Sequence, residues 1–255
     1  MSRVVVRRRS ERRRRLVRAL STVLIVAGAL LTIDAGLTVV WQEPVTALQT
    51  KLRQNGLRAD LEALAATGPT LAERRVLAGL GDDDRRRIAF LARSLKRRTA
   101  DGEAVGRLRI PKIGADFVVV KGSSPEALRK GPGTYDETGL PGTPGTVAIA
   151  GHRTTYLAPF RHIDRLKPGD EITVRMPYAT LTYRVEHSQI VAPDALWVLR
   201  SGTYDRLVLS ACHPLFSSAQ RIVVFARLER AEADPSVASG RASDRRTRVL
   251  RPRPA

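Results

Sequence analysis

The sequence predicts a mainly β protein whose principal domain, residues 103–230, is a closed or partly closed antiparallel barrel with short helices. Short apolar runs rich in β-branched residues recur at close spacing through this region, which is typical of strands. Gly, Pro and Thr concentrate between the runs, most densely over residues 131–144, and predict loops. The last two runs flank a short loop that contains Pro214, which predicts an antiparallel hairpin. A domain of roughly 125 residues is long enough to bury one core.

Two contrasting segments precede this domain. Residues 1–18 contain nine arginines, and residues 19–41 are almost entirely apolar. The stretch 20–41 is close to the ~20 residues that a membrane helix needs. Because arginines lie on its N-terminal side, we expect a single-pass protein of the cell membrane with a cytoplasmic N-terminus and an extracellular C-terminal part.

A cleaved signal peptide, with residues 20–33 as its apolar region, is the alternative to this anchor. No small-x-small cleavage site follows Asp34, which favours an uncleaved anchor. Asp34 is expected near the outer interface, because a carboxylate at the centre of the bilayer costs about 2.5–3.5 kcal/mol.

Residues 42–102 are predicted to be a helical linker or stalk. Thr70 and Glu73 have the spacing of a capping box, and residues 81–84 end that helix and cap a further amphipathic helix over 85–96. Residues 45–54 and 58–66 form two more amphipathic pieces. A helical collar packed on the next domain and a solvated spacer both fit this pattern, and the spacer is the default expectation.

Within the barrel domain the chain alternates short strands with brief helices. Strands are expected at about 106–113, 117–120, 146–150, 171–176, 181–191, 206–212 and 220–228, and short helices at 125–130 and 159–166. Residues 231–255 are rich in arginine and poor in apolar residues, and are predicted to form a basic disordered tail.

The net charge of +19 raises the question of nucleic-acid binding. The N-terminal arginines directly precede an apolar segment, however, so that a membrane partner explains them better and no nucleic acid is expected. The chain contains no internal repeat, no phosphate-binding loop and no cluster with metal-ligand spacing. We therefore expect neither a cofactor nor a metal.

Cys212 is the only cysteine in the chain. An unpaired cysteine outside the cell is either buried and inert or a reactive thiol. In the predicted hairpin Cys212 closes the first strand and Arg221 opens the second, so that a thiol and a guanidinium meet at one end of the pair. This arrangement is suited to acyl transfer, which needs a nucleophile and a donor to the developing oxyanion.

Four histidines are candidates for the base that such a thiol needs. His152 follows a strand and Gly151, and is the best candidate, although a structural role at the strand end fits equally well. His162 is expected on the surface of a short helix. His187 shares strand parity with Tyr183 and is expected to be packed or half-buried. His213 neighbours Cys212 and therefore points to the opposite face of the strand.

Three motifs, in this order along the chain, resemble those of sortases, and most closely the class E sortases of actinobacteria. They are AIAGHRTTY at 148–156, LVLSACHP at 207–214 and RIVV at 221–224, and the Gly- and Pro-rich segment 131–142 resembles that class too. The resemblance implies the sortase β-barrel and a membrane-anchored cysteine transpeptidase. Such an enzyme cleaves a C-terminal LAXTG- or LPXTG-like sorting signal after Thr. It then passes the secreted protein, held as a thioester, to an amine of a cell-wall precursor or a pilin.

By the same resemblance, Cys212 is the nucleophile, His152 the general acid and base, and Arg221 the donor to the threonine carbonyl. Tyr135 is the candidate for choosing Ala over Pro in the signal. The other residues expected to bind substrate are Tyr156, Ala211 and His213. The family usually has Thr before the cysteine, where this chain has Ala211.

Two other functions remain open. An L,D-transpeptidase also uses Cys and His, but its histidine lies close upstream of a Ser/Thr-His-Gly-Cys run that this chain lacks. A membrane-tethered β-barrel that only binds its partner is the non-enzymatic alternative. The presence of Cys212, His152 and Arg221 together argues against such a degenerate barrel.

Overall fold

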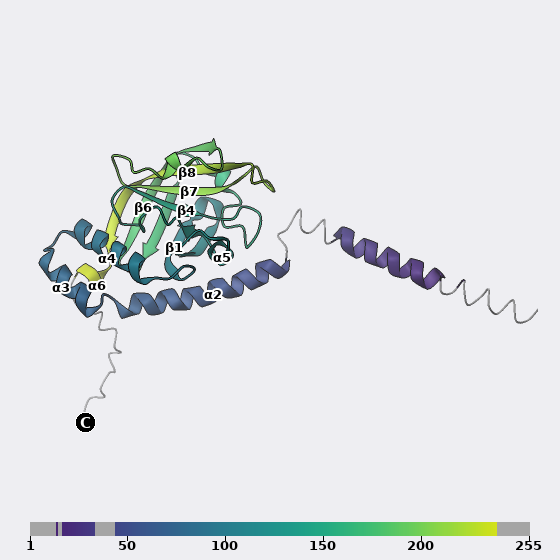
Figure 1. Ribbon diagram of the computed structural model, residues 1–255, viewed down its shortest axis with the longest axis horizontal. Helices are drawn as coiled ribbons and strands as arrows, with labels where there is room; N and C mark the ends of the chain where they lie inside the picture. The colour runs from purple at the N-terminus through teal and green to yellow at the C-terminus, as the bar shows by residue number, and fades with distance from the viewer. Residues whose placement is uncertain (1–13, 15–16, 34–43, 239–255) are drawn as a thin grey trace, which may run out of the picture. The chain divides into compact units, whose positions relative to one another are not determined.

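The computed structural model describes residues 14, 17–33 and 44–238 (Figure 1). The chain divides into two compact units, residues 1–45 and 46–255. In the first unit, residues 17–33 are helical and their large apolar side chains are exposed. Among the described residues, no helix combines the length and the apolar character that a membrane span requires. Part of the predicted anchor, residues 34–41, lies outside the described residues, and the anchor stays a prediction.

The second unit contains a closed barrel (Figure 1). Its strands follow one another around the barrel in the order β1-β2-β3-β4-β7-β8-β6-β5. They are β1 (Ala104–Ile110), β2 (Ala115–Val120), β3 (Gly133–Thr134), β4 (Thr146–Ala150), β5 (Glu171–Met176), β6 (Ala179–Val191), β7 (Arg206–His213) and β8 (Gln220–Ala233). The barrel closes where β1 pairs with β5, which confirms the mainly β fold that the sequence predicts.

The barrel is not purely antiparallel, and that part of the prediction is wrong. The strands β2 and β3 pair in parallel, and so do β4 and β7. Every residue of β4 is buried, as are the five central residues of β7. A continuous apolar run of this kind is typical of a parallel strand that is covered on both faces.

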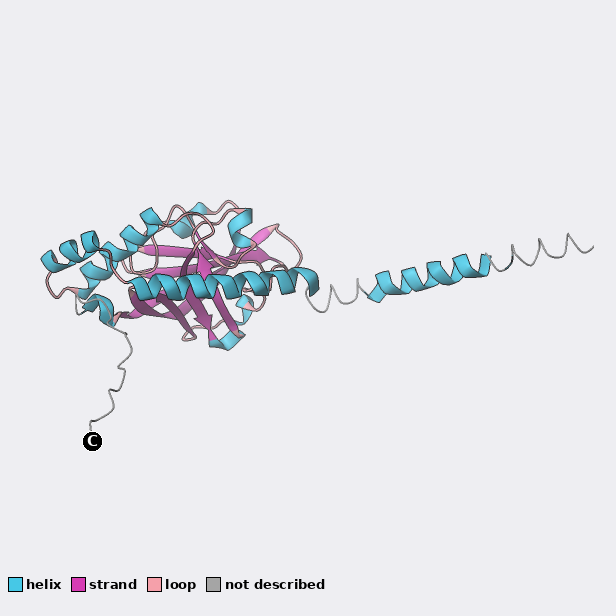
Figure 2. Cartoon of the chain, turned by 90° about the horizontal axis from the view of Figure 1, so that it is seen from below, coloured by secondary structure: helices cyan, strands magenta, loops and turns pink. Residues whose placement is uncertain are grey.

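One long helix and several shorter ones accompany the barrel (Figure 2). Its α-helices are α2 (Pro44–Thr67), α3 (Leu71–Gly79), α4 (Asp84–Arg98), α5 (Pro125–Leu128) and α6 (Pro235–Ala238), and its 3₁₀ helices are η1 (Pro111–Ile113), η2 (Ile163–Arg165) and η3 (Leu196–Leu199). The predicted capping box at Thr70 and Glu73 is confirmed, and Asp83 caps α4. One helix, α2, spans both amphipathic pieces that were predicted separately.

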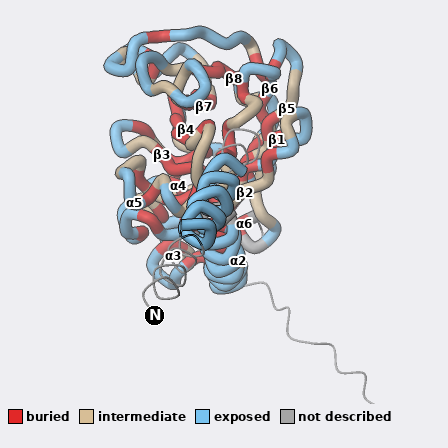
Figure 3. The backbone as a smooth tube through the Cα atoms, turned by 90° about the vertical axis from the view of Figure 1, so that its right-hand side faces the viewer, coloured by how far each residue is buried: buried red, intermediate tan, exposed pale blue. Residues whose placement is uncertain are grey.

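The helix α4 packs on the barrel. Ile88, Leu91 and Leu95 are buried in the same apolar cluster as Leu108 of β1 and Ile149 of β4. The packed collar, and not the solvated spacer, is therefore the correct interpretation of this part of the linker. Figure 3 shows that buried segments concentrate on the barrel strands, whereas most of α2 is exposed.

Gln54 is one of several side chains that fasten α2 to the barrel, beside Leu57, which is buried with Val118 and Val120 of β2. Gln54 is 4% exposed, and its Nε2 donates hydrogen bonds to Val118 O (3.1 Å) and Lys130 O (2.7 Å). Its Oε1 accepts a hydrogen bond from Val118 N (2.7 Å). The amide of Gln54 thus bonds both backbone groups of Val118, as a neighbouring strand would.

The C-terminal end of the barrel domain extends further than predicted. β8 continues to Ala233, and Val237 of α6 is buried in the main core. Asp234 N donates to Tyr178 O (2.9 Å). The predicted disorder is therefore wrong for residues 231–238, because Val237 supplies an apolar anchor; residues 239–255 lie outside the described residues.

Candidate active site

Three neighbouring strands bring the predicted catalytic residues to one end of the barrel. Cys212 lies near the end of β7, and its partner in the antiparallel register of β8 is Arg221. On the other side of β7, Ala150 of β4 lies opposite Ser210, and Gly151 N donates to Ser210 O (3.0 Å). Because β4 and β7 run parallel, the next residues along this register place His152 beside Cys212. Cys212 is a free cysteine and is partly exposed.

The imidazole of His152 is half-buried and has an unused nitrogen. Its ring centroid lies 4.9 Å from that of Tyr156. Nε2 is buried and has no hydrogen-bond partner among the described residues. Burial, and secondarily the positive charge of Arg129, hold the pKa of His152 below its ordinary value of 6.5. The ring is therefore neutral at neutral pH, as a proton acceptor must be.

Arg221 is partly occupied by its own hairpin. Nη1 donates hydrogen bonds to Ser218 O (2.9 Å) and Gln220 O (3.0 Å). A guanidinium carries five N–H donors, so that Nε and Nη2 remain to bind an incoming carbonyl.

A small pocket of about 40 Å³ lies beside Arg221. Its polar lining comes from Tyr135, Ser210 and Arg221. Its apolar wall comes from the end of β6, the segment that follows it and β8: Val191, Ala192, Pro193, Ala195, Leu196, Val198, Leu199 and Val223. The side chain of Leu196 is exposed. The arrangement is suited to a short extended peptide with apolar side chains and a polar backbone.

The remaining predicted substrate contacts have different surroundings. Ala211 is buried in the barrel core, so its side chain faces away from the pocket. Tyr156 packs on His152 and begins a run of three residues with positive φ, a conformation that non-glycine residues rarely adopt. His213 is bonded to Arg153.

The other two histidines do not join the site. His162 precedes η2 and is half-buried. His187 is exposed and stacks on the ring of Phe225, with centroids 4.6 Å apart. The prediction that His187 is packed or half-buried is wrong, because an irregularity in the pairing between Val185 and His187 reverses the parity on which it was based.

The sequence did not single out Arg153, although it follows His152 directly. Its side chain is 3% exposed and lies 3.0 Å from Asp164 and 3.0 Å from His213. Arginine is almost never fully buried without a partner. Its position next to His152 in the motif could have drawn attention to Arg153. Its burial, which makes it significant, is visible only in the structure.

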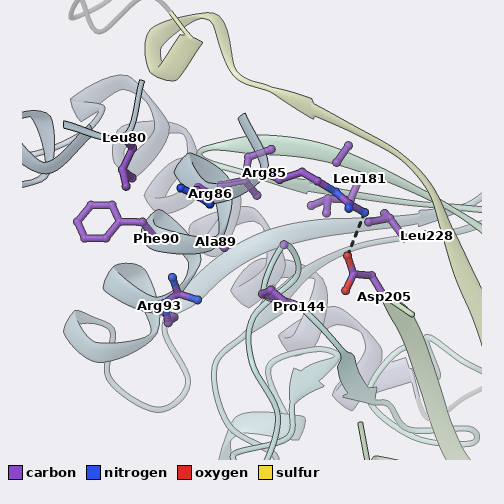
Figure 4. Close-up of a pocket in the computed structure, with 13 residues that line it drawn as sticks. Leu80, Arg85, Arg86, Ala89, Phe90, Arg93, Pro144, Leu181, Asp205 and Leu228 are labelled. Atoms are coloured by element: carbon purple, nitrogen blue, oxygen red, sulfur yellow. Dashed lines mark hydrogen bonds and ion pairs between the residues drawn. The ribbon is translucent and has the colours of Figure 1, made fainter. Parts of the chain in front are cut away.

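A larger pocket, of about 480 Å³, lies between α4 and the barrel (Figure 4). Its walls are mainly apolar, and Arg85 and Asp205 form an ion pair of 3.5 Å at its edge. Asp205 precedes β7 and Leu228 lies in β8, so this pocket is at the opposite end of the hairpin from Cys212. No cysteine or histidine belongs to its described lining. Nor do the described residues contain a cluster of His, Cys, Asp and Glu that could hold a metal ion.

Comparison with known proteins shows what this domain is similar to. Residues 108–229 match the family model described as the Sortase domain. The chain is 32% identical to Sortase D of Bacillus subtilis over 44% of this chain and 56% of that protein. It is 30% identical to Sortase SrtE1 of Streptomyces coelicolor over 50% of this chain and 41% of that protein. The chain thus spans about half the length of these curated relatives.

A solved structure supports the fold as well. The SrtF sortase from Corynebacterium diphtheriae superimposes with a TM-score of 0.51 at 25% identity, over 55% of this chain and 94% of that one. Residues 108–229 thus match the Sortase domain, and over this part the chain is similar to sortases in sequence and in fold.

Proposed function

We propose that the chain is a cysteine transpeptidase that cleaves a C-terminal LAXTG- or LPXTG-like sorting signal after Thr and transfers the protein to an amine. The observation that carries this proposal is the strand register. Arg221 is the partner of Cys212 in the register with β8, and Ala150, two residues before His152, is the partner of Ser210, two residues before Cys212, which supports His152 and Arg221 as the neighbours of the nucleophile.

In the acylation step, the sulfur of Cys212 attacks the carbonyl carbon of the signal's threonine, and the thiol proton passes to the neutral imidazole of His152. Arg221 donates a hydrogen bond to the oxyanion that forms. The tetrahedral intermediate then collapses and the C–N bond to glycine breaks. The departing amine takes the proton from His152, and the acyl group remains on Cys212 as a thioester.

The second step reverses these roles. An amine of a cell-wall precursor or a pilin attacks the thioester carbon and gives a proton to His152. The C–S bond breaks, an amide forms, and the proton returns to the sulfur of Cys212. A half-buried imidazole whose pKa is lowered is suited to both steps, because it is neutral and free to accept a proton at neutral pH and, once protonated, releases the proton readily.

The pocket beside Arg221 is the proposed site for the sorting signal. Tyr135 lines it together with Arg221, which favours this tyrosine as the residue that distinguishes Ala from Pro in the signal. The similarity to a class E sortase favours the LAXTG form. The apolar stretch 20–41 is the proposed membrane anchor, with a cytoplasmic N-terminus and the catalytic domain outside the cell.

The test is turnover of two peptides, one with Leu-Ala-x-Thr-Gly and one with Leu-Pro-x-Thr-Gly, by the purified full-length chain, with triglycine as the acceptor. We expect the wild type to release the glycine-containing fragment and to join the acyl part to triglycine. Cys212→Ala should abolish both reactions, and Arg221→Ala should lower turnover by about 10²–10³.

Arg230→Ala is the matched control, because Arg230 also lies in β8 but is exposed and pairs only with Glu232. We expect this variant to keep wild-type turnover. Equal peptide cleavage by wild type and Cys212→Ala would overturn the proposal.

A further inference from the structure

We propose that Arg153 is a positioning residue that holds His152 beside Cys212 by bonding His213. The inference rests on the proposed function, because it concerns the same reaction. Arg153 is the residue after His152, and His213 is the residue after Cys212. The hydrogen bond between their side chains, 3.0 Å from Nη1 to Nδ1, therefore joins the two catalytic segments one residue away from each reacting group.

All three guanidinium nitrogens of Arg153 are engaged. Besides the bond to His213, Nη2 lies 3.0 Å from Asp164 Oδ1, and Nε donates to Arg161 O (3.4 Å). The carboxylate of Asp164 balances the buried positive charge, since a buried charge without a partner is strongly destabilising. The guanidinium of Arg153 is thus held by Asp164 in the 3₁₀ helix η2 and by Arg161 just before it, and it reaches His213 at the end of β7.

The bond also determines the state of His213. A guanidinium has donors only, so Nδ1 of His213 must be the acceptor and the ring proton must be on Nε2. If Nδ1 of His213 carried a proton, its N–H would face an N–H of Arg153, and the hydrogen bond between the two side chains would be lost. His213 is therefore a neutral acceptor in this arrangement and is not available at Nδ1 as a second base.

Besides its ring contact with Tyr156 and the hydrogen bond that Phe160 N donates to its backbone oxygen (3.0 Å), His152 has little to fix its ring. In many nucleophile–base pairs a third group bonds the base and fixes its ring. Among the described residues the ring of His152 contacts Tyr156 and its Nε2 has no partner. The chain that follows is irregular up to η2, with positive φ at residues 156–158. Because Arg153 directly follows His152, the bonds that fix the side chain of Arg153 also restrict the backbone of His152.

The expected effect is on the rate and not on the binding of the signal. A misplacement of about 1 Å at a reacting group costs about 10²-fold in rate. Arg153→Met keeps an unbranched chain but removes every donor, so we expect the rate of acylation to fall by about 10- to 100-fold. Neither Arg153 nor His213 lines the pocket that holds Tyr135 and Arg221, so KM should remain close to the wild-type value.

The test is a double-mutant cycle in the full-length chain, with single-turnover acylation by the sorting peptide as the readout. His213→Leu removes the acceptor. His213→Asn retains one, because Oδ1 of Asn is bonded to Cγ as Nδ1 of His is. We expect Arg153→Met and His213→Leu to lose the same factor, the double variant to lose no more than either, and His213→Asn to lose less than His213→Leu.

Arg165→Met is the matched control, since Arg165 neighbours Asp164 but is exposed. It should acylate as the wild type does. Wild-type acylation by Arg153→Met, or losses that multiply in the double variant, would overturn the inference. The melting temperature of each variant, measured alongside, distinguishes a displaced His152 in a folded protein from a destabilised fold.

A second readout does not require the sorting peptide. The rate of alkylation of Cys212 by iodoacetamide, followed against pH, should show an inflection that His152→Gln removes, because a nearby imidazolium promotes the thiolate. Arg153→Met should weaken this inflection and Arg165→Met should not. If the wild type forms no acyl-enzyme, the proposed function fails, and this profile still decides the role of Arg153: an unchanged inflection in Arg153→Met rejects it.

Discussion

Replacing Gln54 by Leu tests whether α2 is an integral part of the barrel domain. The Gln54 amide is the hydrogen-bond partner of Val118 N and O on the side of β2 that faces β3. On this side β2 has little other support, since its ladder with β3 consists of the pair Val120 and Gly133. Leu fits the helix as well as Gln does but offers no polar atom.

The magnitude follows from the groups left without a partner. Gln54→Leu removes the partner of Val118 N, of Val118 O and of Lys130 O. A buried donor or acceptor left unpaired costs about 1–3 kcal/mol. The two backbone groups of Val118 lie in a buried contact, so we expect the free energy of unfolding to fall by about 2–5 kcal/mol. In a domain of this size each kcal/mol lowers Tm by about 2–4 °C, so that a drop of about 5–15 °C should follow.

The assay is thermal unfolding of the full-length variant followed by circular dichroism. Gln49→Leu is the matched control, because Gln49 lies on the same helix but is exposed, and its Tm should match that of the wild type. Gln54→Glu should also be destabilised at neutral pH and partly recover when the pH is lowered, because only a protonated carboxyl can donate. A Tm of Gln54→Leu that equals that of Gln49→Leu would refute the argument.

Three further predictions concern the collar and the base. Leu95→Ala in α4 should cost about 2–5 kcal/mol in denaturant unfolding, whereas a solvated helix would lose almost nothing. Arg129→Gln should raise the pKa of His152 in an NMR titration, because it removes a positive charge that lowers it; an unchanged titration would show that burial alone is responsible. Since the folded pKa of His152 is depressed, the unfolded chain binds the proton more strongly. His152 therefore lowers stability as the pH falls below 6.5, and His152→Gln should lose less stability between neutral and acidic pH.

The strands and caps could be predicted because they depend on short-range patterns. Alternating and β-branched runs marked the barrel, and Thr70 and Glu73 marked a helix start that the structure confirms. The antiparallel pairing of Cys212 with Arg221 followed from the hairpin, which the structure also confirms. The catalytic roles of these residues remain predictions.

What could not be predicted depends on which distant segments meet. The parallel pairing of β4 with β7 brings His152 beside Cys212, and no local pattern specifies it. Local periodicity also did not show that α4 belongs to the barrel core, since an amphipathic helix fits a stalk and a collar equally. The burial of Arg153 was hidden for the same reason, because its partner Asp164 lies in η2 and His213 in β7.

The most direct test of the central claim is the intact mass of the full-length protein after incubation with the Leu-Ala-x-Thr-Gly peptide. The account predicts a mass increase equal to the peptide fragment that ends in Thr, located on Cys212 and released by hydroxylamine. The adduct should be absent in Cys212→Ala and should form slowly in His152→Gln. An unmodified wild-type protein whose Cys212 still reacts with iodoacetamide would contradict the claim that this end of the barrel is an acyl-transfer site.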